Sequence, residues 1–545
     1  MEIGSAYASD RAAEPLFGAS WRRDWDATLG PYWPYLLPLF AVCLFMGGAT
    51  VPLSDADLSM HLAIGEWVVR HRTVPFVEPF AWTRAGDPFY AYSWGIEALY
   101  FVVLQSLGPV GLYMLHGLTL AAAAAAIVVL GAAARWNGWT TLLVTAVHLV
   151  VAIGIVPSLR PQGVLLVLVP LAWALAYRVR DAERIGPSLV GLFLCAVIAV
   201  NSHLFFPLIA VPGVVLLIQS PVRWRRVFLF SGVIAAGWML TPYALHVAEV
   251  FRQNLTSHAP YRSPSPIDEY MPGFASFSRG GGTVVFVAPA LMVLPWLVVG
   301  TLERRARGWF GFLWLVGLTA FGVAFRGLLI WWLVMLPLAG VASGMLRPPL
   351  ERVVLTTQRA LVALLFGAMA MLGGGALADP WERTAPLPSR RLPSVAASGI
   401  EPIAEWLDCN ARPIAGSRLL TTYNFGGYAR WRMPYLSESI DGRTIFPDSV
   451  GVAETYFLPV RRTLPLPPWR SAELAIVPVS YPVAAVLDTA SGWRRVAMTA
   501  DRNGPPRMIG LWVTERWWTR AGRAPLPDRA VPLFHVLPGG GCLTS

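Results

Sequence analysis

The chain has 545 residues, of which 55% are hydrophobic and only 14% are charged, and its mean hydropathy is +0.53. This composition excludes an ordinary water-soluble protein, because so few charged residues cannot cover a surface of normal size. The formal net charge of +11 does not indicate a nucleic-acid partner, because the arginines gather in short loops between apolar runs, where positive charge sets membrane orientation.

Residues 1–30 are expected to form a cytoplasmic segment, and residues 31–379 a transmembrane domain. The first segment carries arginines but lacks the short apolar core of a cleaved signal, so we expect the first span to be a retained anchor. Predominantly apolar runs then predict about eleven transmembrane helices, although 94–107 is short for a span and could be partly interfacial. The runs cover residues 32–52, 94–107, 110–134, 138–157, 161–178, 187–219, 224–241, 283–301, 309–325, 327–346 and 356–378.

Arginine-rich loops predict the orientation of these spans. RWRR (223–226), ERRAR (303–307) and RPPLER (347–352) should be cytoplasmic. This orientation places a long outer loop at 242–282 and everything after residue 379 on the outer side.

The run 187–219 is predicted to be a hairpin. The loop RVRDAER (178–184) also favours the cytoplasm, and satisfying it makes the run fold back between Asn201 and His203. This topology places Asn201, His203 and Arg160 on the outer side.

Residues 380–545 are predicted to form a small extracytoplasmic α/β domain. Prolines cluster from residue 380, and short apolar stretches then alternate with turn signals. Strands are expected at 418–423, 472–479 and 507–515, with a helix at 482–488.

Cysteines and glycines give two further expectations for this domain. Cys409 and Cys542 could form a disulfide if the domain is extracytoplasmic. Gly426 and Gly427 are interpreted as marking a tight turn, in which glycine supplies a positive φ.

The first outer loop, residues 53–93, opens with SDADLSMHL (54–62). Asp57 and His61 are four residues apart and would share one face of a helix, while the leucines beside them face lipid. A surface helix parallel to the membrane fits this pattern. Taken alone, Asp55 is more typical of a helix cap than of a catalyst.

Several motifs extend the pattern along the chain. The first loop contains Asp55-Ala56-Asp57-Leu58, His61-Leu62 and Gly65-Glu66-Trp67. It is followed by Ser93-Trp94 with Glu97, Arg160-Pro161-Gln162, Asn201 with His203, Pro242-Tyr243, Asp268-Glu269-Tyr270, Arg326 with Pro337, and Asn424 to Tyr428. In this order the motifs resemble a bacterial multispan family related to the GT-C glycosyltransferases, a superfamily that includes protein O-mannosyltransferases and the aminoarabinose transferase of lipid A.

The resemblance implies a GT-C-like fold with a reaction centre in the first outer loop. In such enzymes an aspartate there lies near the anomeric carbon of a sugar carried on a polyprenyl phosphate. A carboxylate in that place can accept the proton of an attacking hydroxyl. Asp55 is therefore the first candidate for the catalytic base, and Asp57 the second.

The departing phosphate needs positive donors, which Arg160 and Arg326 could supply. The residues expected to bind substrate are His61, Arg160, Gln162, Asn201, His203, Glu269 and Arg326. Arginine at the end of a span also commonly snorkels to headgroups, and histidine there commonly caps or packs, so a structural interpretation stays open for these side chains.

A divalent cation such as Mg²⁺ or Mn²⁺ is conceivable in this loop. Asp55, Asp57, His61 and Glu269 include the hard oxygen ligands that such ions prefer. No spacing in the sequence requires a cation, and the metal therefore stays open.

The sequence predicts a multispan enzyme of the bacterial inner membrane that transfers a sugar from a polyprenyl-phosphate donor to a glycan, lipid or protein acceptor at the outer face. Two alternatives remain: a transporter or flippase for lipid-linked glycans, and a non-catalytic scaffold in envelope assembly. Charge at one face, without paired halves of interrupted helices, argues against transport. The retained carboxylates argue, less strongly, against a scaffold.

Overall fold

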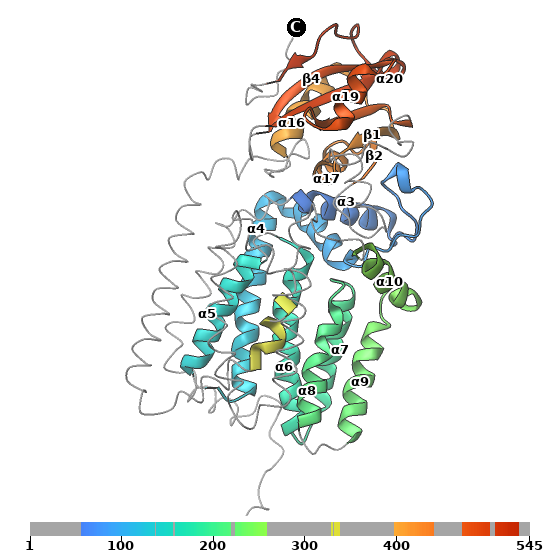
Figure 1. The fold of residues 1–545 in the computed structure, drawn as a ribbon. Coiled ribbons are helices and arrows are strands. Elements are labelled where there is room, and N and C mark those ends of the chain that lie inside the picture. The colour runs from blue at the N-terminus through green and yellow to red at the C-terminus, as the bar shows by residue number, and fades with distance from the viewer. Residues whose placement is uncertain are drawn as a thin grey trace, which may run out of the picture.

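The computed structural model describes residues 56–136, 138–155, 159–219, 224–258, 329–330, 332–337, 397–440, 471–501 and 507–533. Figure 1 shows two stacked parts, a bundle of helices and an α/β domain at one end of it. Three residues of the predicted site, Asp55, Glu269 and Arg326, lie outside the described residues.

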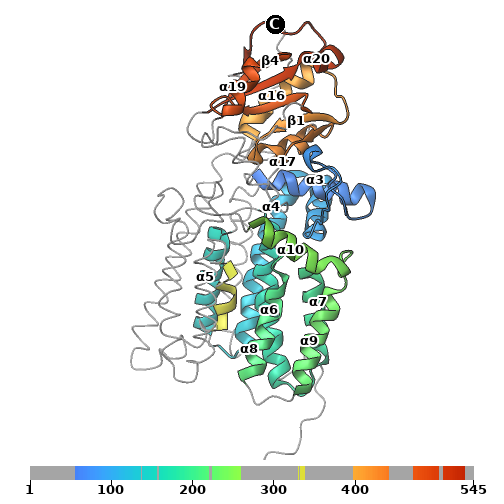
Figure 2. The same cartoon turned by 45° about the vertical axis from the view of Figure 1, so that its right-hand side comes forward.

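The described helical part contains long and short helices. The α-helices are α3 (Ala56–His71), α4 (Trp94–Ala133), α5 (Gly138–Ile155), α6 (Leu165–Asp181), α7 (Gly186–Val200), α8 (Val211–Gln219), α9 (Trp224–Trp238) and α10 (Val247–His258). Short 3₁₀ helices are η2 (Trp82–Arg84), η3 (Pro161–Val164), η4 (Phe206–Ile209) and η5 (Ala244–His246). In Figure 2, α3 lies crosswise between the bundle and the α/β domain.

Helix α4 contains a break at Gly108. The sequence predicts two separate runs, 94–107 and 110–134, and the structure has two helical segments on either side of the non-helical residue Gly108. Gly108 has φ 66° and ψ −164°, which side chains with a Cβ rarely adopt. Pro109 follows it and removes a backbone donor. The regular helix is therefore interrupted at Gly108 and Pro109, and a second helical segment follows.

The predicted hairpin at 187–219 is confirmed. Helix α7 ends at Val200, and α8 returns along the bundle, with both helices packed against α6. The turn places Asn201 beside the start of α4, where Trp94 Nε1 donates a hydrogen bond of 2.8 Å to Asn201 Oδ1.

Two stretches of the described chain are long and apolar enough to cross a bilayer, Trp94–Ala133 and Pro161–Asp181. Helix α7 is shorter, but Val190, Leu194 and Ile198 form a stripe on it with exposed fractions of 59%, 53% and 48%. Such an apolar stripe is unfavourable against water and compatible with lipid. Four of the predicted spans lie wholly outside the described residues: 32–52, 283–301, 309–325 and 356–378.

Buried polar groups tie the bundle helices together. His148 on α5 donates from Nε2 to the carbonyl of Leu166 at 3.0 Å, and its Nδ1 accepts from Trp332 Nε1 at 2.8 Å. Trp173 on α6 donates to the carbonyl of Leu333 at 3.0 Å. Because both nitrogens of His148 are satisfied by protein groups, this histidine is structural.

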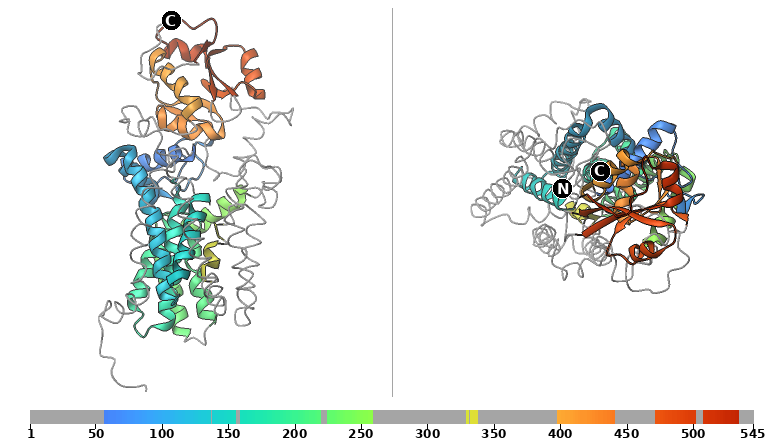
Figure 3. Two further views of the ribbon diagram at one scale, coloured as in Figure 1. Left: turned by 90° about the vertical axis from the view of Figure 1, so that its left-hand side faces the viewer. Right: turned by 90° about the horizontal axis from the view of Figure 1, so that it is seen from above.

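The α/β domain is built on a mixed sheet of six strands in the order β2-β1-β3-β5-β4-β6. The strands are β1 (Ser417–Thr421), β2 (Leu436–Glu438), β3 (Leu474–Pro478), β4 (Trp493–Asp501), β5 (Arg507–Thr514) and β6 (Val531–Pro532). Its helices are α16 (Ala397–Asn410), α17 (Tyr423–Arg432), α19 (Pro482–Thr489) and α20 (Glu515–Ala521). The view from above in Figure 3 shows the sheet lying over the ends of the bundle helices.

The three predicted strands and the predicted helix are confirmed as β1, β3, β5 and α19. β1 pairs in parallel with both β2 and β3, whereas β5 is antiparallel to β3 and β4. Strand β4 (WRRVAMTAD) is not predicted from the sequence, because its paired arginines interrupt the apolar pattern.

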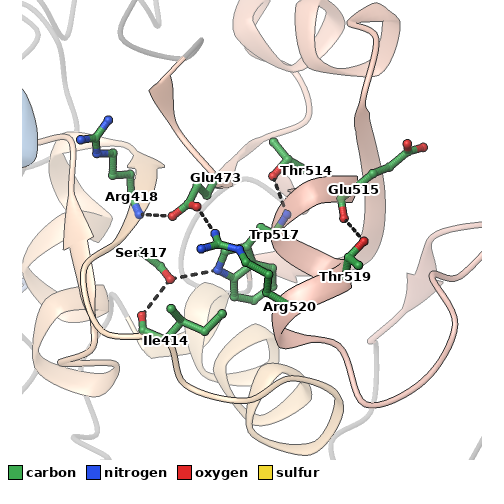
Figure 4. Close-up of polar contacts among 9 residues, drawn as sticks. All are labelled: Ile414, Ser417, Arg418, Glu473, Thr514, Glu515, Trp517, Thr519 and Arg520. Carbon is green, nitrogen blue, oxygen red and sulfur yellow. Dashed lines mark hydrogen bonds and ion pairs between the residues drawn. The ribbon is translucent and has the colours of Figure 1, made fainter.

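Polar contacts fix α20 to the sheet, as Figure 4 shows. Trp517 Nε1 donates to Ser417 Oγ at 2.9 Å, and that hydroxyl donates to the carbonyl of Ile414 at 2.8 Å. The carboxylate of Glu473 accepts from the backbone nitrogen of Arg418 and forms an ion pair with Arg520. These contacts join the start of β1 to a helix about 100 residues later in the chain.

Candidate functional site

Helix α3 brings the predicted first-loop residues together at the end of the bundle nearest the α/β domain. Leu58 and Leu62 are 0% exposed and belong to a core shared with α4 and with α17. The expectation that these leucines face lipid is therefore wrong. Helix α17 of the α/β domain packs on α3 and shares this core.

Asp57, at the start of α3, faces Arg160, which immediately precedes η3. Arg160 Nη2 lies 3.3 Å from Asp57 Oδ2, and the two side chains are 17% and 27% exposed. An ion pair that is shielded to this degree is screened less than one on an open surface. Residues a hundred positions apart thus meet as a charged pair at one end of the bundle.

His61, one turn further along α3, faces Glu97 on the first turn of α4. His61 Nδ1 lies 2.8 Å from Glu97 Oε1, and the exposed fractions of their side chains are 14% and 4%. The second carboxylate oxygen of Glu97, Oε2, is buried and has no hydrogen-bond partner in the part of the chain that the structure describes. Within the described residues, His61 is therefore the side chain that pairs with this buried carboxylate.

A close helix crossing holds this pair in place. A Cβ atom on Gly65 of α3 would lie 2.0 Å from the carbonyl oxygen of Glu97. Because the main chains approach this closely only at glycine, Gly65 sets the separation of α3 and α4 at the turn after His61.

A narrow cleft adjoins the ion pair. It lies between α4 and residues 159–166, has a free volume of about 20 Å³, and is lined by Arg160, His116, Thr119 and apolar side chains. The volume matches a single water molecule. The Nε2 atom of His116 is buried there and lacks a hydrogen-bond partner among the described residues.

Asn201 and His203 lie at the same end of the bundle, and both hydrogen-bond to neighbouring protein groups. Asn201 accepts from Trp94 and donates from Nδ2 to the carbonyls of Val197 and Leu240 at 2.8 and 2.9 Å. His203 Nδ1 accepts from the backbone nitrogen of Phe205 at 3.1 Å. The contacts of Asn201 join α4, α7 and the end of α9. They require a side chain that both donates and accepts hydrogen bonds, as asparagine does.

Gln162 lies in η3, two residues after Arg160, and is 9% exposed. It is close in sequence to the Arg160–Asp57 pair, and within the described residues its side chain makes no hydrogen bond or ion pair. The structure thus brings Asp57, His61 and Arg160 to one place and puts Gln162 beside them.

Tyr243, from the Pro242-Tyr243 motif, holds the segment between Pro75 and Ala91 to the bundle. Its hydroxyl donates to the carbonyl of Pro75 at 2.9 Å and accepts from the backbone nitrogen of Ala91 at 3.0 Å. Burial raises the pKa of this hydroxyl well above its ordinary value of 10.0, so it remains a donor at neutral pH.

The α/β domain packs directly on the first loop. A Cβ atom on Gly427 of α17 would lie 2.9 Å from Met60 Cβ of α3. Ser437 Oγ donates to the carbonyl of Phe80 at 2.6 Å, and Trp82 Nε1 donates to the carbonyl of Leu419 at 3.3 Å. Close packing and side-chain hydrogen bonds to main-chain carbonyls therefore fix the position of the α/β domain on this loop.

The glycine pair at 426 and 427 is a helical feature, and its interpretation as a turn is wrong. Both residues lie within α17, and neither is among the glycines with positive φ. Position 427 requires a small residue because α3 packs closely against α17 there. A glycine at a helix crossing and a glycine in a turn give the same sequence signal.

A cation site is not assembled by the residues that the structure describes. Asp57 is paired with Arg160 and His61 with Glu97. In the described ranges no group of three or more His, Cys, Asp or Glu side chains could hold a metal ion. The other two candidate ligands, Asp55 and Glu269, lie outside the described residues.

Glu97 was not among the predicted site residues, although its motif was noted. The available signal was a carboxylate in the first turn of a long apolar helix, three residues after the start of the helix at Trp94. That position equally fits the preference for acidic residues at helix N-termini. Only the crossing of α3 and α4 shows that Glu97 faces His61.

No family model matches the chain, and no curated protein matches it. Among solved structures, two cryo-EM structures of the arabinofuranosyltransferase AftD from Mycobacteria are similar to it. One, of a point mutant, is 13% identical with a TM-score of 0.47 and covers 88% of this chain and 41% of the AftD chain. The other is 15% identical with a TM-score of 0.45 and covers 88% and 40%. The chain spans about two fifths of the length of these structures.

Proposed function

We propose that this protein is an integral-membrane glycosyltransferase that moves a sugar from a polyprenyl-phosphate carrier to an envelope glycan, lipid or protein. The observation that carries the proposal is the meeting of two shielded polar pairs, Asp57 with Arg160 and His61 with Glu97, on consecutive turns of α3. Convergence of such groups at one place is what distinguishes a site from scattered helix caps.

Arg160 is the proposed binding group for the departing phosphate. Negative charge develops on that phosphate as the bond to the sugar breaks, and a guanidinium can stabilise it through two parallel hydrogen bonds. Asp57 holds the guanidinium near the start of α3.

The other residues implied by the resemblance remain part of the proposal. Asp55 is proposed as a carboxylate of the reaction centre, and Glu269 and Arg326 as further substrate-binding residues. His203 and Gln162 are proposed to line the approach to the site. The tight contacts of Asn201 favour a structural contribution over a contact with substrate.

The proposed location is a bacterial inner membrane, with the α/β domain on the outer side. Cys409 of α16 is disulfide-bonded, and its partner lies outside the described residues. Disulfides persist mainly in oxidising compartments outside the cytoplasm, which supports an extracytoplasmic domain. The apolar stripe on α7 supports contact with lipid.

The Asp55→Asn variant tests the placement of the reaction centre in the first outer loop. Transfer of a labelled sugar by purified protein in proteoliposomes is expected to fall at least about tenfold, because a carboxylate that interacts with the reacting groups is lost. Membrane insertion and melting temperature should stay as in the wild type. Full transfer by this variant would remove Asp55 from the proposed site.

A further inference from the structure

The His61–Glu97 pair has the geometry of a base with its orienting acid. An ionised carboxylate can only accept a hydrogen bond, so the contact of 2.8 Å between His61 Nδ1 and Glu97 Oε1 places the ring proton on Nδ1. The lone pair of the neutral ring is then on Nε2. Within the described residues no protein group hydrogen-bonds to that atom.

Asp57 is in a less favourable position to accept a proton. Its carboxylate is engaged by Arg160 at 3.3 Å, and a neighbouring cation favours the charged form of a carboxylate over the protonated form. His61 lies one turn away on the same face, about 5–6 Å between Cβ atoms. A ligand whose phosphate contacts Arg160 is therefore bound within about one helical turn of His61.

We propose that His61 is the catalytic base of the transfer and that Glu97 is its positioning residue, a role that rests on the proposed function. The oxygen of the acceptor hydroxyl forms a bond to the anomeric carbon, and the bond from that carbon to the phosphate oxygen breaks. The bonding electron pair leaves with the phosphate, and the hydroxyl proton passes to His61 Nε2. The imidazolium then gives this proton to the departing phosphate or to solvent.

Glu97 suits the positioning role because its charge is directed at His61. The carboxylate is 4% exposed, and Oε2 makes no hydrogen bond within the described chain. A buried carboxylate that fixes the tautomer and stabilises the imidazolium is the arrangement that activates a histidine in hydrolases of unrelated fold.

Within the described residues, the charged groups around His61 come from three segments. Glu97 faces it from α4, Asp57 lies one turn away on α3, and Arg160 reaches α3 from the segment before η3. Helix α17 also packs on α3, but it does so with Phe425, Tyr428 and Ala429 and with the Gly427 contact. The negative charge next to the ring is that of Glu97.

The pH dependence of the rate tests this role. Purified full-length protein in proteoliposomes is given synthetic farnesyl phosphoryl hexoses and pentoses with a cell-envelope extract as acceptor, and release of farnesyl phosphate is measured. The wild-type rate should fall towards acidic pH, because a protonated imidazole cannot accept the proton of the hydroxyl. His61→Gln should lower kcat about a hundredfold and abolish this dependence.

The Glu97 variants separate positioning from folding. Glu97→Gln can still accept the hydrogen bond but lacks the charge, so the acidic limb of the pH profile should move to lower pH, with a reduced kcat. Glu97→Asp should restore part of the rate and move the limb back. Glu249→Gln is the matched control, because Glu249 pairs with Arg252 at the protein surface, and its profile should equal that of the wild type. Melting temperatures of all variants are measured alongside.

Two results would overturn the inference. A limb near pH 4, the ordinary range of carboxyl groups, that disappears in Asp55→Asn while His61→Gln keeps the wild-type rate would assign the proton to Asp55 and leave the proposed function intact. Failure of the wild type to release farnesyl phosphate from any of these donors would contradict the proposed function, and with it the role of His61.

Discussion

Replacing Arg160 with glutamine is expected to lower the rate of sugar transfer about 10²–10³-fold, equivalent to about 2.7–4 kcal/mol of lost stabilisation of the transition state. Glutamine retains a hydrogen-bond donor but lacks the charge and the forked geometry of the guanidinium. The loss should appear in kcat, because the charge on the phosphate grows only as the bond to the sugar breaks. Steady-state transfer in proteoliposomes measures it.

The control for this variant is Arg252→Gln. Arg252 is 64% exposed and pairs with Glu249 on its own helix, α10, at the same end of the bundle as the candidate site (Figure 1). Its substitution should leave transfer unchanged. An Arg160→Gln variant that keeps the wild-type kcat and melts at a lower temperature would show that Arg160 serves only to hold α3 to the bundle.

Replacing Gly65 with alanine is expected to abolish measurable transfer. The added methyl carbon would lie 2.0 Å from the carbonyl oxygen of Glu97, a separation that neither backbone can tolerate. Helix α3 has to move away from α4, and the contact of 2.8 Å between His61 and Glu97 is then lost. A shift of about 1 Å in a catalytic group can by itself reduce a rate about a hundredfold.

The same substitution at Gly232 provides the comparison. Gly232 lies within α9, and a Cβ atom there would meet no atom within 4 Å. Alanine at an exposed helix position should stabilise slightly, because glycine is the poorer helix former. Transfer and melting temperature are measured for both variants. Wild-type transfer by Gly65→Ala would mean that activity does not depend on the approach of α3 to α4.

Local sequence patterns account for the elements of the α/β domain but not for its position. Apolar stretches between turn signals predicted β1, β3, β5 and α19, because the periodicity of a strand or helix depends on residues close together in the sequence. The contact between Gly427 and Met60 joins residues more than 360 positions apart. No local pattern reports such a pairing, so the glycines of α17 were assigned to a turn.

The candidate site was predictable to the extent that its residues share one helix. The spacing of Asp57 and His61 indicated a common helix face, and the structure places both side chains against the bundle. Their partners come from other segments, and only the folded chain brings Arg160 and Glu97 to α3. The same dependence on tertiary packing explains why Leu58 and Leu62, apolar in either environment, were assigned to lipid.

The position of the α/β domain also bears on how the site works. α17 covers one face of α3 while α4 supports another, so the helix that carries Asp57 and His61 is held from two sides. A rigid support of this kind keeps polar groups aligned for chemistry.

Transfer by the purified wild-type protein in sealed proteoliposomes tests the central claim most directly. A polyprenyl-phosphate-linked labelled sugar is supplied together with an envelope acceptor, and both the glycosidic product and the side of the bilayer that carries the label are followed. We predict that label appears on the acceptor in a new glycosidic bond and that polyprenyl phosphate is released. Movement of the intact lipid-linked sugar across the bilayer, with no glycosidic product, would contradict the account and identify a transporter.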